Sequence, residues 1–188
     1  RMRADIGKLK SGKASVSMHC PALPLNKQQT GRLAETIAIT SFLSWGFEVF
    51  VPLVDDRGID FLVRHPDSLK MLEIQVKGVT GRKYAYIRKS TTNPKTTHMR
   101  YVCYARFDSQ PCPELFLIPV KAWESPNPVL VDYAYDSPGC KSKPEYGINY
   151  SKKNAHLLEP YRMDTMLKDY AMRHKMPIHK STVVLNTR

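Results

Sequence analysis

Three polar residues that could act on a phosphate group interrupt two apolar stretches of the chain. Asp60 lies within GIDFLV (58–63), and Gln75 and Lys77 alternate with apolar residues in LEIQVKG (72–78). A carboxylate and an amide carbonyl are oxygen ligands that suit Mg²⁺, which offsets phosphodiester charge and lowers the pKa of a bound water. The ammonium group of Lys77 can stabilise the charge of the transition state or orient the attacking water.

A fourth candidate, Glu35, lies on a predicted helix. The segment from Gln29 to Gly46 places Leu33, Ile37, Thr40, Phe42 and Leu43 near helical spacing, and Gly46 is a typical helix stop. Each candidate alone has a plainer explanation. A strand aspartate is often a hydrogen-bonded structural residue, a helix glutamate is usually solvated, and a QxK triplet is common in a lysine-rich chain. The four residues therefore carry meaning only together.

The elements that must position these residues follow the two-residue period of strands. Side chains at i and i+2 share a face and lie about 6.8 Å apart along a strand. If the second and third strands form a hairpin, Asp60, Gln75 and Lys77 converge on one point. The predicted order is a helix and three strands, then further strands, long loops over 123–153 and a closing helix near Met163–Arg173. The predicted strands are 47–54, 59–65, 70–78, 83–89, 99–107 and 114–120, the last two as a hairpin.

The motifs GID, ending at Asp60, and QVK, from Gln75 to Lys77, follow a helix that bears Glu35. This arrangement resembles the core of the PD-(D/E)XK nuclease superfamily, in particular its branch of Holliday-junction-resolvase-like proteins and intron-encoded homing endonucleases. The resemblance spans residues 29–120. It implies an α/β fold with a restriction-endonuclease-like core, in which helices flank a mixed sheet.

The same resemblance implies a Mg²⁺-dependent DNA endonuclease, with Mn²⁺ able to replace Mg²⁺. It makes Glu35, Asp60 and Gln75 the metal ligands and Lys77 the catalytic lysine. It also implies a homodimer or homotetramer, because cutting both strands with a small enzyme takes two active sites. Two positions depart from the family pattern: no proline precedes Asp60, and Gln75 replaces the usual Asp or Glu, which removes one negative charge from the metal site.

The charge of the chain indicates a polyanionic partner. The 188 residues include 29 Lys and Arg against 17 Asp and Glu, a net charge of +12. No acidic residue occurs between Ile74 and Phe107, a stretch that interleaves tyrosines with cations. We therefore expect duplex or branched DNA to contact this stretch, through Arg82, Lys83, Arg88, Lys89, Lys95 and Arg100.

Two other functions remain open on the sequence alone. One is a catalytically silent nucleic-acid-binding module on the same fold, which the glutamine at position 75 makes plausible. The other is a basic protein without nuclease activity that binds a protein or a membrane surface. Retention of both Asp60 and Lys77 favours the enzyme.

The remaining composition is that of an ordinary globular protein. Hydrophobic residues make up 42% and charged residues 24%, and no apolar run approaches the roughly 20 residues of a membrane span. The four cysteines form no CxxC pair, which argues against a zinc site and for reduced thiols. We expect a cytoplasmic protein that is not secreted and does not bind membranes, associated with the nucleoid if bacterial. It should comprise a basic arm (1–28), one nuclease-like domain (29–175) and a basic tail (176–188).

Overall fold

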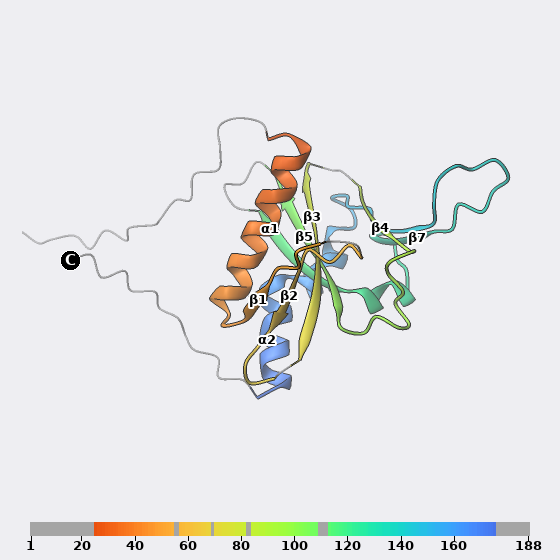
Figure 1. Cartoon of the computed structure of the whole chain (residues 1–188). Coiled ribbons are helices and arrows are strands. Elements are labelled where there is room, and N and C mark those ends of the chain that lie inside the picture. Colours follow the sequence, from red (N-terminus) through yellow and green to blue (C-terminus); the bar gives the residue numbers. More distant parts are fainter. Residues whose placement is uncertain (1–24, 55–56, 69, 82–83, 109–112, 176–188) are drawn as a thin grey trace, which may run out of the picture.

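The computed structural model of the chain describes residues 25–54, 57–68, 70–81, 84–108 and 113–175. Two α-helices, eight strands and two 3₁₀-helices form this part of the molecule (Figure 1). In chain order they are α1 (Lys27–Ser44), β1 (Glu48–Phe50), β2 (Phe61–Arg64), β3 (Met71–Thr80), β4 (Ala85–Arg88), β5 (Arg100–Phe107), β6 (Glu114–Pro119), η1 (Val120–Glu124), β7 (Leu130–Tyr133), β8 (Glu145–Ile148), η2 (Ala155–Tyr161) and α2 (Met163–Arg173). None of these described helices is both long and apolar enough to cross a membrane.

Five strands form a mixed sheet, which we call sheet A, in the order β1-β2-β3-β5-β6. The pairing of β3 with β5 is parallel, and the other pairings are antiparallel. The prediction of an α/β fold with a mixed sheet flanked by helices is therefore confirmed. The predicted hairpin neighbours β2 and β3 pair directly, as do β5 and β6.

Helices α1 and α2 pack on one face of sheet A (Figure 1). Alternate residues of β3, Leu72, Ile74 and Val76, share a buried cluster with Ala34 of α1 and Leu167 of α2. Because side chains alternate along a strand, Gln75 and Lys77 belong to the opposite face. The α-helices thus cover the apolar side of β3 and leave its polar side to other elements.

A second sheet, sheet B, has the order β4-β8-β7 and packs on the other face of sheet A. Its Ala85, Ile87 and Ile148 share a buried cluster with Tyr104 of β5 and Phe116 of β6. From β3, only Val79 near the end of the strand belongs to that cluster. Sheet B therefore covers β5 and β6, and the Gln75–Lys77 part of β3 remains open beside it.

The sequence missed most of sheet B. Residues 123–153 were expected to form long loops, but they contain β7, β8 and the end of η1. Both strands have only four residues, and β8 is recognised as a strand by its pairing with β4, far away in the chain. Short strands paired over such a separation leave no local periodic signal.

Two element boundaries also differ from expectation. Helix α1 begins at Lys27, inside the predicted arm 1–28, because the Asn26 side chain and Gln29 form a reciprocal capping box. Strand β1 ends at Phe50 instead of residue 54, just before Pro52, a residue type that cannot donate a backbone hydrogen bond to a sheet. The rest of the predicted arm and the whole predicted tail lie outside the described residues.

The buried face of α1 consists of small residues where it meets the sheet. Thr30, Ala34, Ala38 and Phe42 are buried, while Leu43, which was expected on the core side, is 54% exposed. The close approach of α1 to Gly78 of β3 leaves no room for side chains larger than those of Thr30 and Ala34.

Gly78→Ala should destabilise the protein by about 1–3 kcal/mol, the usual cost of overpacking. A Cβ atom at Gly78 would lie 2.7 Å from the Ala34 Cβ and 2.9 Å from the Thr30 carbonyl oxygen, so α1 would have to move. Urea unfolding of both variants measures the effect. Gly31→Ala is the matched control: its Cβ would meet nothing within 4 Å, and alanine in a helix gains about 0.5–1 kcal/mol over glycine. Equal stability of Gly78→Ala and the wild type would contradict the close packing of α1 on β3.

Candidate active site

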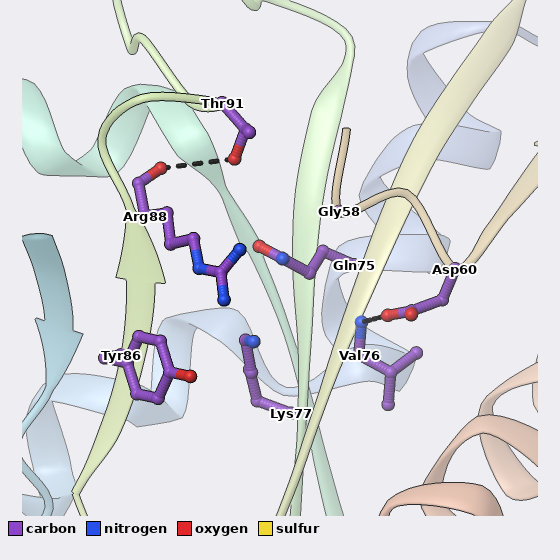
Figure 2. Close-up of a pocket in the computed structure, with 8 residues that line it drawn as sticks. All are labelled: Gly58, Asp60, Gln75, Val76, Lys77, Tyr86, Arg88 and Thr91. Carbon is purple, nitrogen blue, oxygen red and sulfur yellow. Dashed lines mark hydrogen bonds between the residues drawn. The ribbon is translucent and has the colours of Figure 1, made fainter. Parts of the chain in front are cut away.

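A polar pocket of about 230 Å³ lies between β3 and β4, where sheet B leaves β3 uncovered (Figure 2). Its lining comes from the approach to β2, from β3, and from β4 with the turn that follows it. The lining residues are Gly58, Asp60, Gln75, Val76, Lys77, Tyr86, Arg88 and Thr91. The structure therefore brings together three of the four predicted catalytic residues.

Asp60 is held against β3 by its own backbone and by its side chain. Its N–H donates to the Ile74 carbonyl at 2.9 Å, and its Oδ2 accepts a hydrogen bond from the Val76 N–H (Figure 2). These contacts extend the antiparallel register in which Phe61 pairs with Ile74. The hairpin thus fixes the carboxylate beside the strand that carries Gln75 and Lys77.

Gln75 presents an acceptor without a donor. The residue is 8% exposed, and its Oε1 accepts no hydrogen bond from the described part of the chain. Its Nε2 lies against Gly58, where an added Cβ would approach it to 2.7 Å, and Gly58 has a φ of +68° that favours glycine. A buried carbonyl oxygen left without a donor costs about 1–3 kcal/mol, which a cation bound at the pocket would recover.

Lys77 contacts the opposite wall of the pocket. Its Nζ lies 5.3 Å from the centroid of the Tyr86 ring, within the range of a cation–π interaction. Figure 2 shows Tyr86 and Arg88 of β4 on one side of the pocket, facing Lys77 and Gln75 of β3 on the other. The two residues of each strand are two positions apart and therefore share a face.

Glu35 does not line this pocket. Its carboxylate pairs with Arg32 at 2.8 Å on the surface of α1, which packs on the other face of β3 from Gln75 and Lys77. The metal-binding role predicted for Glu35 stays a prediction.

The predicted nucleic-acid contacts fall in different environments. Arg88 lines the pocket, and Lys95 is exposed on the loop before β5. Lys89 pairs with Asp132 and lies over the Tyr146 ring. Arg82 and Lys83 lie outside the described residues.

Arg100 is buried and engaged within the protein. It is 4% exposed, and its Nε donates to Glu73 at 2.8 Å. Its Nη1 reaches the carbonyl oxygens of Arg57 and Thr91. Arg57 precedes Gly58, and Thr91 itself lines the pocket, so Arg100 ties together the two segments that border the site.

The pocket residues fit a divalent cation with oxygen ligands. The described residues contain no group of three or more His, Cys, Asp or Glu side chains suited to a metal. Mg²⁺ does not need one, because it keeps several waters and is commonly bound by one or two carboxylates with the substrate phosphate. Asp60 and the donor-free Oε1 of Gln75 line one pocket, where they would offer two oxygen ligands to such an ion.

The thiol of Cys103 is buried near the pocket. Cys103 is fully buried on β5, beside Val76 of β3. Burial first, and then the negative charge of Asp60, raise its pKa to about 12, so the thiol stays protonated at neutral pH.

Sequence reasoning overlooked the part that β4 and its neighbours play in the site. In the sequence, Tyr86 is one of several tyrosines in the acid-free stretch from Ile74 to Phe107, and nothing there distinguishes Gly58 or Thr91. The alternation of exposed Tyr84, Tyr86 and Arg88 with buried Ala85 and Ile87 was a signal in the sequence. Its meaning depended on the position of β4 opposite β3.

Among known proteins, the chain resembles solved structures but matches no sequence family. No family model matches the chain, and no curated protein matches it by sequence search. Among solved structures, the bacterial homing endonuclease I-Ssp6803I superposes with a TM-score of 0.50 at 16% identity, over 80% of this chain and 97% of that one. The Holliday junction resolvase Hjc of Archaeoglobus fulgidus gives a TM-score of 0.44 at 11% identity, over 79% and 98%. The chain therefore has the restriction-endonuclease-like fold that its sequence motifs predicted, similar to that of a homing endonuclease.

Proposed function

We propose that the protein is a metal-dependent DNA endonuclease that hydrolyses phosphodiester bonds. The observation that carries the proposal is the convergence of Asp60, Gln75 and Lys77 on one polar pocket, with the Gln75 Oε1 left without a donor. The similarity to I-Ssp6803I supports a fold on which nuclease chemistry occurs.

Each pocket residue has a role in this proposal. Asp60 and Gln75 would hold Mg²⁺ or Mn²⁺, with Glu35 as the further ligand predicted from sequence. The bound metal would supply positive charge for the phosphate and acidify a water. Lys77 points into the same pocket, where its ammonium group stabilises negative charge on the reacting phosphate and orients water for attack.

DNA is the proposed partner and the cytoplasm the proposed compartment. A net charge of +12 favours a polyanion, and Arg88 and Lys95 are accessible cations near β4. Cleavage of both strands by one small domain calls for two active sites, so we propose a homodimer or homotetramer. Sedimentation with and without DNA measures that state.

Cleavage of labelled DNA tests the function. Linear duplex, four-way junction and single-stranded DNA would be incubated with Mg²⁺, Mn²⁺ or EDTA. We expect cutting of at least one substrate with either metal and none in EDTA. Absence of cutting on all three substrates, in protein that binds DNA, would refute the enzyme.

The competing function is a silent DNA-binding module, and Gln75 is the observation that favours it. A glutamine brings one negative charge fewer than the carboxylate usual at this position, which weakens metal binding. Gln75→Glu separates the two functions. An active wild type should keep activity with a changed metal requirement, whereas gain of cleavage by the variant alone would identify the wild type as the silent module.

A further inference from the structure

Two more hollows adjoin the candidate active site, one at each end of β4. The first is about 290 Å³ and shares Lys77 and Tyr86 with the central pocket. The second is about 810 Å³ and shares Tyr86 and Arg88 with it. Tyr86 lines all three hollows, and we call the three together the β4 groove.

The two ends of the β4 groove differ in chemistry. Lys27, Tyr84 and Tyr86 line the smaller hollow, together with the apolar Leu25 and Val79. The larger hollow is cationic and hydroxyl-rich. It is lined by Arg88, Lys89, Ser90, Ser142 and Lys143, with Glu145 as its acid.

The charge of the β4 groove suits a polyanion. Its lining contains five cations, Lys27, Lys77, Arg88, Lys89 and Lys143, against the acids Asp60 and Glu145. Lys89 is paired with Asp132, and Glu145 accepts hydrogen bonds from the hydroxyls of Tyr84 and Tyr135. No ion pair within the described residues engages Arg88 or Lys143, both of which are exposed. Their charge is available to a ligand.

The geometry of β4 sets the direction of that ligand. Tyr84, Tyr86 and Arg88 follow one another at every second position, so neighbours along the groove are about 6.8 Å apart. Figure 2 shows Tyr86 and Arg88 turned toward Lys77 and Gln75. An extended chain of phosphates lying parallel to β4 would therefore pass the catalytic residues in the middle of its path.

We propose that the β4 groove binds one strand of nucleic acid lengthwise. The reacting phosphate lies in the central pocket, Arg88 and Lys143 bind the phosphate on one side, and a nucleotide on the other side packs on Tyr86. This rests on the proposed function for the identity of the central phosphate. Exposed aromatic rings beside a cationic groove are the usual means of holding an unpaired strand without sequence preference.

Binding without cleavage tests the path. The full chain would be titrated against a fluorescent single-stranded oligonucleotide in EDTA, over a series of salt concentrations. Lys143→Ala should weaken binding by about threefold and lower the slope of log K against log salt by about 0.7, the loss of one phosphate contact. Lys121→Ala, which removes an equal charge from an exposed site on η1 outside the groove, should do neither.

The tyrosine end has its own variants. Tyr86→Ala should weaken binding by about tenfold, since a stacked base is lost, and Tyr86→Phe should bind like the wild type. Thermal unfolding of each variant verifies the fold. Equal affinities for Lys143→Ala and Lys121→Ala, or for Tyr86→Ala and the wild type, would overturn the path.

These experiments distinguish failure of the proposed nucleic-acid path from failure of the proposed endonuclease function. If the wild type cuts DNA but the groove variants bind and cut as it does, the β4 groove is not the path and the endonuclease stands. If the groove variants lose affinity but no substrate is cut, the path stands and the endonuclease is refuted.

Discussion

Lys77→Ala is expected to lower kcat for DNA cleavage by about 10²–10⁴-fold, the contribution of a positioned proton-transfer or charge-stabilising group. Lys77 is the pocket cation on the same strand as Gln75, two residues away and on the same face. Its loss leaves the developing phosphate charge to the metal and Arg88. DNA affinity should fall far less, because many other cations contribute to binding.

Lys77→Arg should not restore the activity. The guanidinium is larger and planar, and it prefers two-pronged contacts, whereas the ammonium is a compact charge. In the pocket this compact charge lies 5.3 Å from the Tyr86 ring centroid, a position that a planar guanidinium does not reproduce. Single-turnover cleavage with Mg²⁺ measures both variants beside Lys121→Ala. Wild-type rates in Lys77→Ala would remove Lys77 from the chemistry and with it the main support for the enzyme.

Arg100→Met is expected to destabilise the protein by about 1.5–3 kcal/mol, the usual contribution of hydrogen bonds to a charged group. The guanidinium is buried, pairs with Glu73 and reaches the backbone of Arg57 and Thr91. For a protein of this size, each kcal/mol lowers Tm by about 2–4 °C. Calorimetry of the variant gives Tm directly.

The matched control is Arg64→Met, which breaks an ion pair of similar length, 2.7 Å, with Glu48 at the surface. Exposed pairs contribute about 0–1 kcal/mol, so Tm should change little. If Arg100 contacts DNA, as the sequence predicted, its replacement should weaken DNA binding and leave Tm unchanged. An unchanged Tm together with weaker DNA binding in Arg100→Met would support that contact and contradict the structural role.

The sequence predicted sheet A and the central pocket well because both depend on local patterns. The alternation around Gln75 and Lys77 identified β3 and its polar face, and the short turn at 66–68 made β2 its hairpin neighbour. This pairing places Asp60 beside β3. The closing helix, Met163–Arg173, agrees with its prediction residue for residue.

What the sequence could not reveal depends on contacts between distant segments. Arg100 is buried because β5 pairs in parallel with β3, which places it beside Glu73. The wall formed by Tyr86 and Arg88 exists because β4 pairs with β8. Strands of four residues have too short a periodic pattern to indicate which strand they will pair with. The need for small residues at Thr30 and Ala34 of α1 comes from Gly78, a residue on another element.

The two walls of the pocket belong to two sheets, and the buried cluster beneath the α-helices differs from the one between the sheets. Asp60, Gln75 and Lys77 depend on the packing of α1 and α2, whereas Tyr86 and Arg88 depend on the packing of sheet B. Mutations at the exposed positions of β4, Tyr86 and Arg88, can therefore accumulate without disturbing the core of the strand that carries Gln75 and Lys77. Descendants of such a protein could acquire new substrates by changing the exposed face of β4 while inheriting β3 unchanged, which makes the architecture a favourable starting point for diversification.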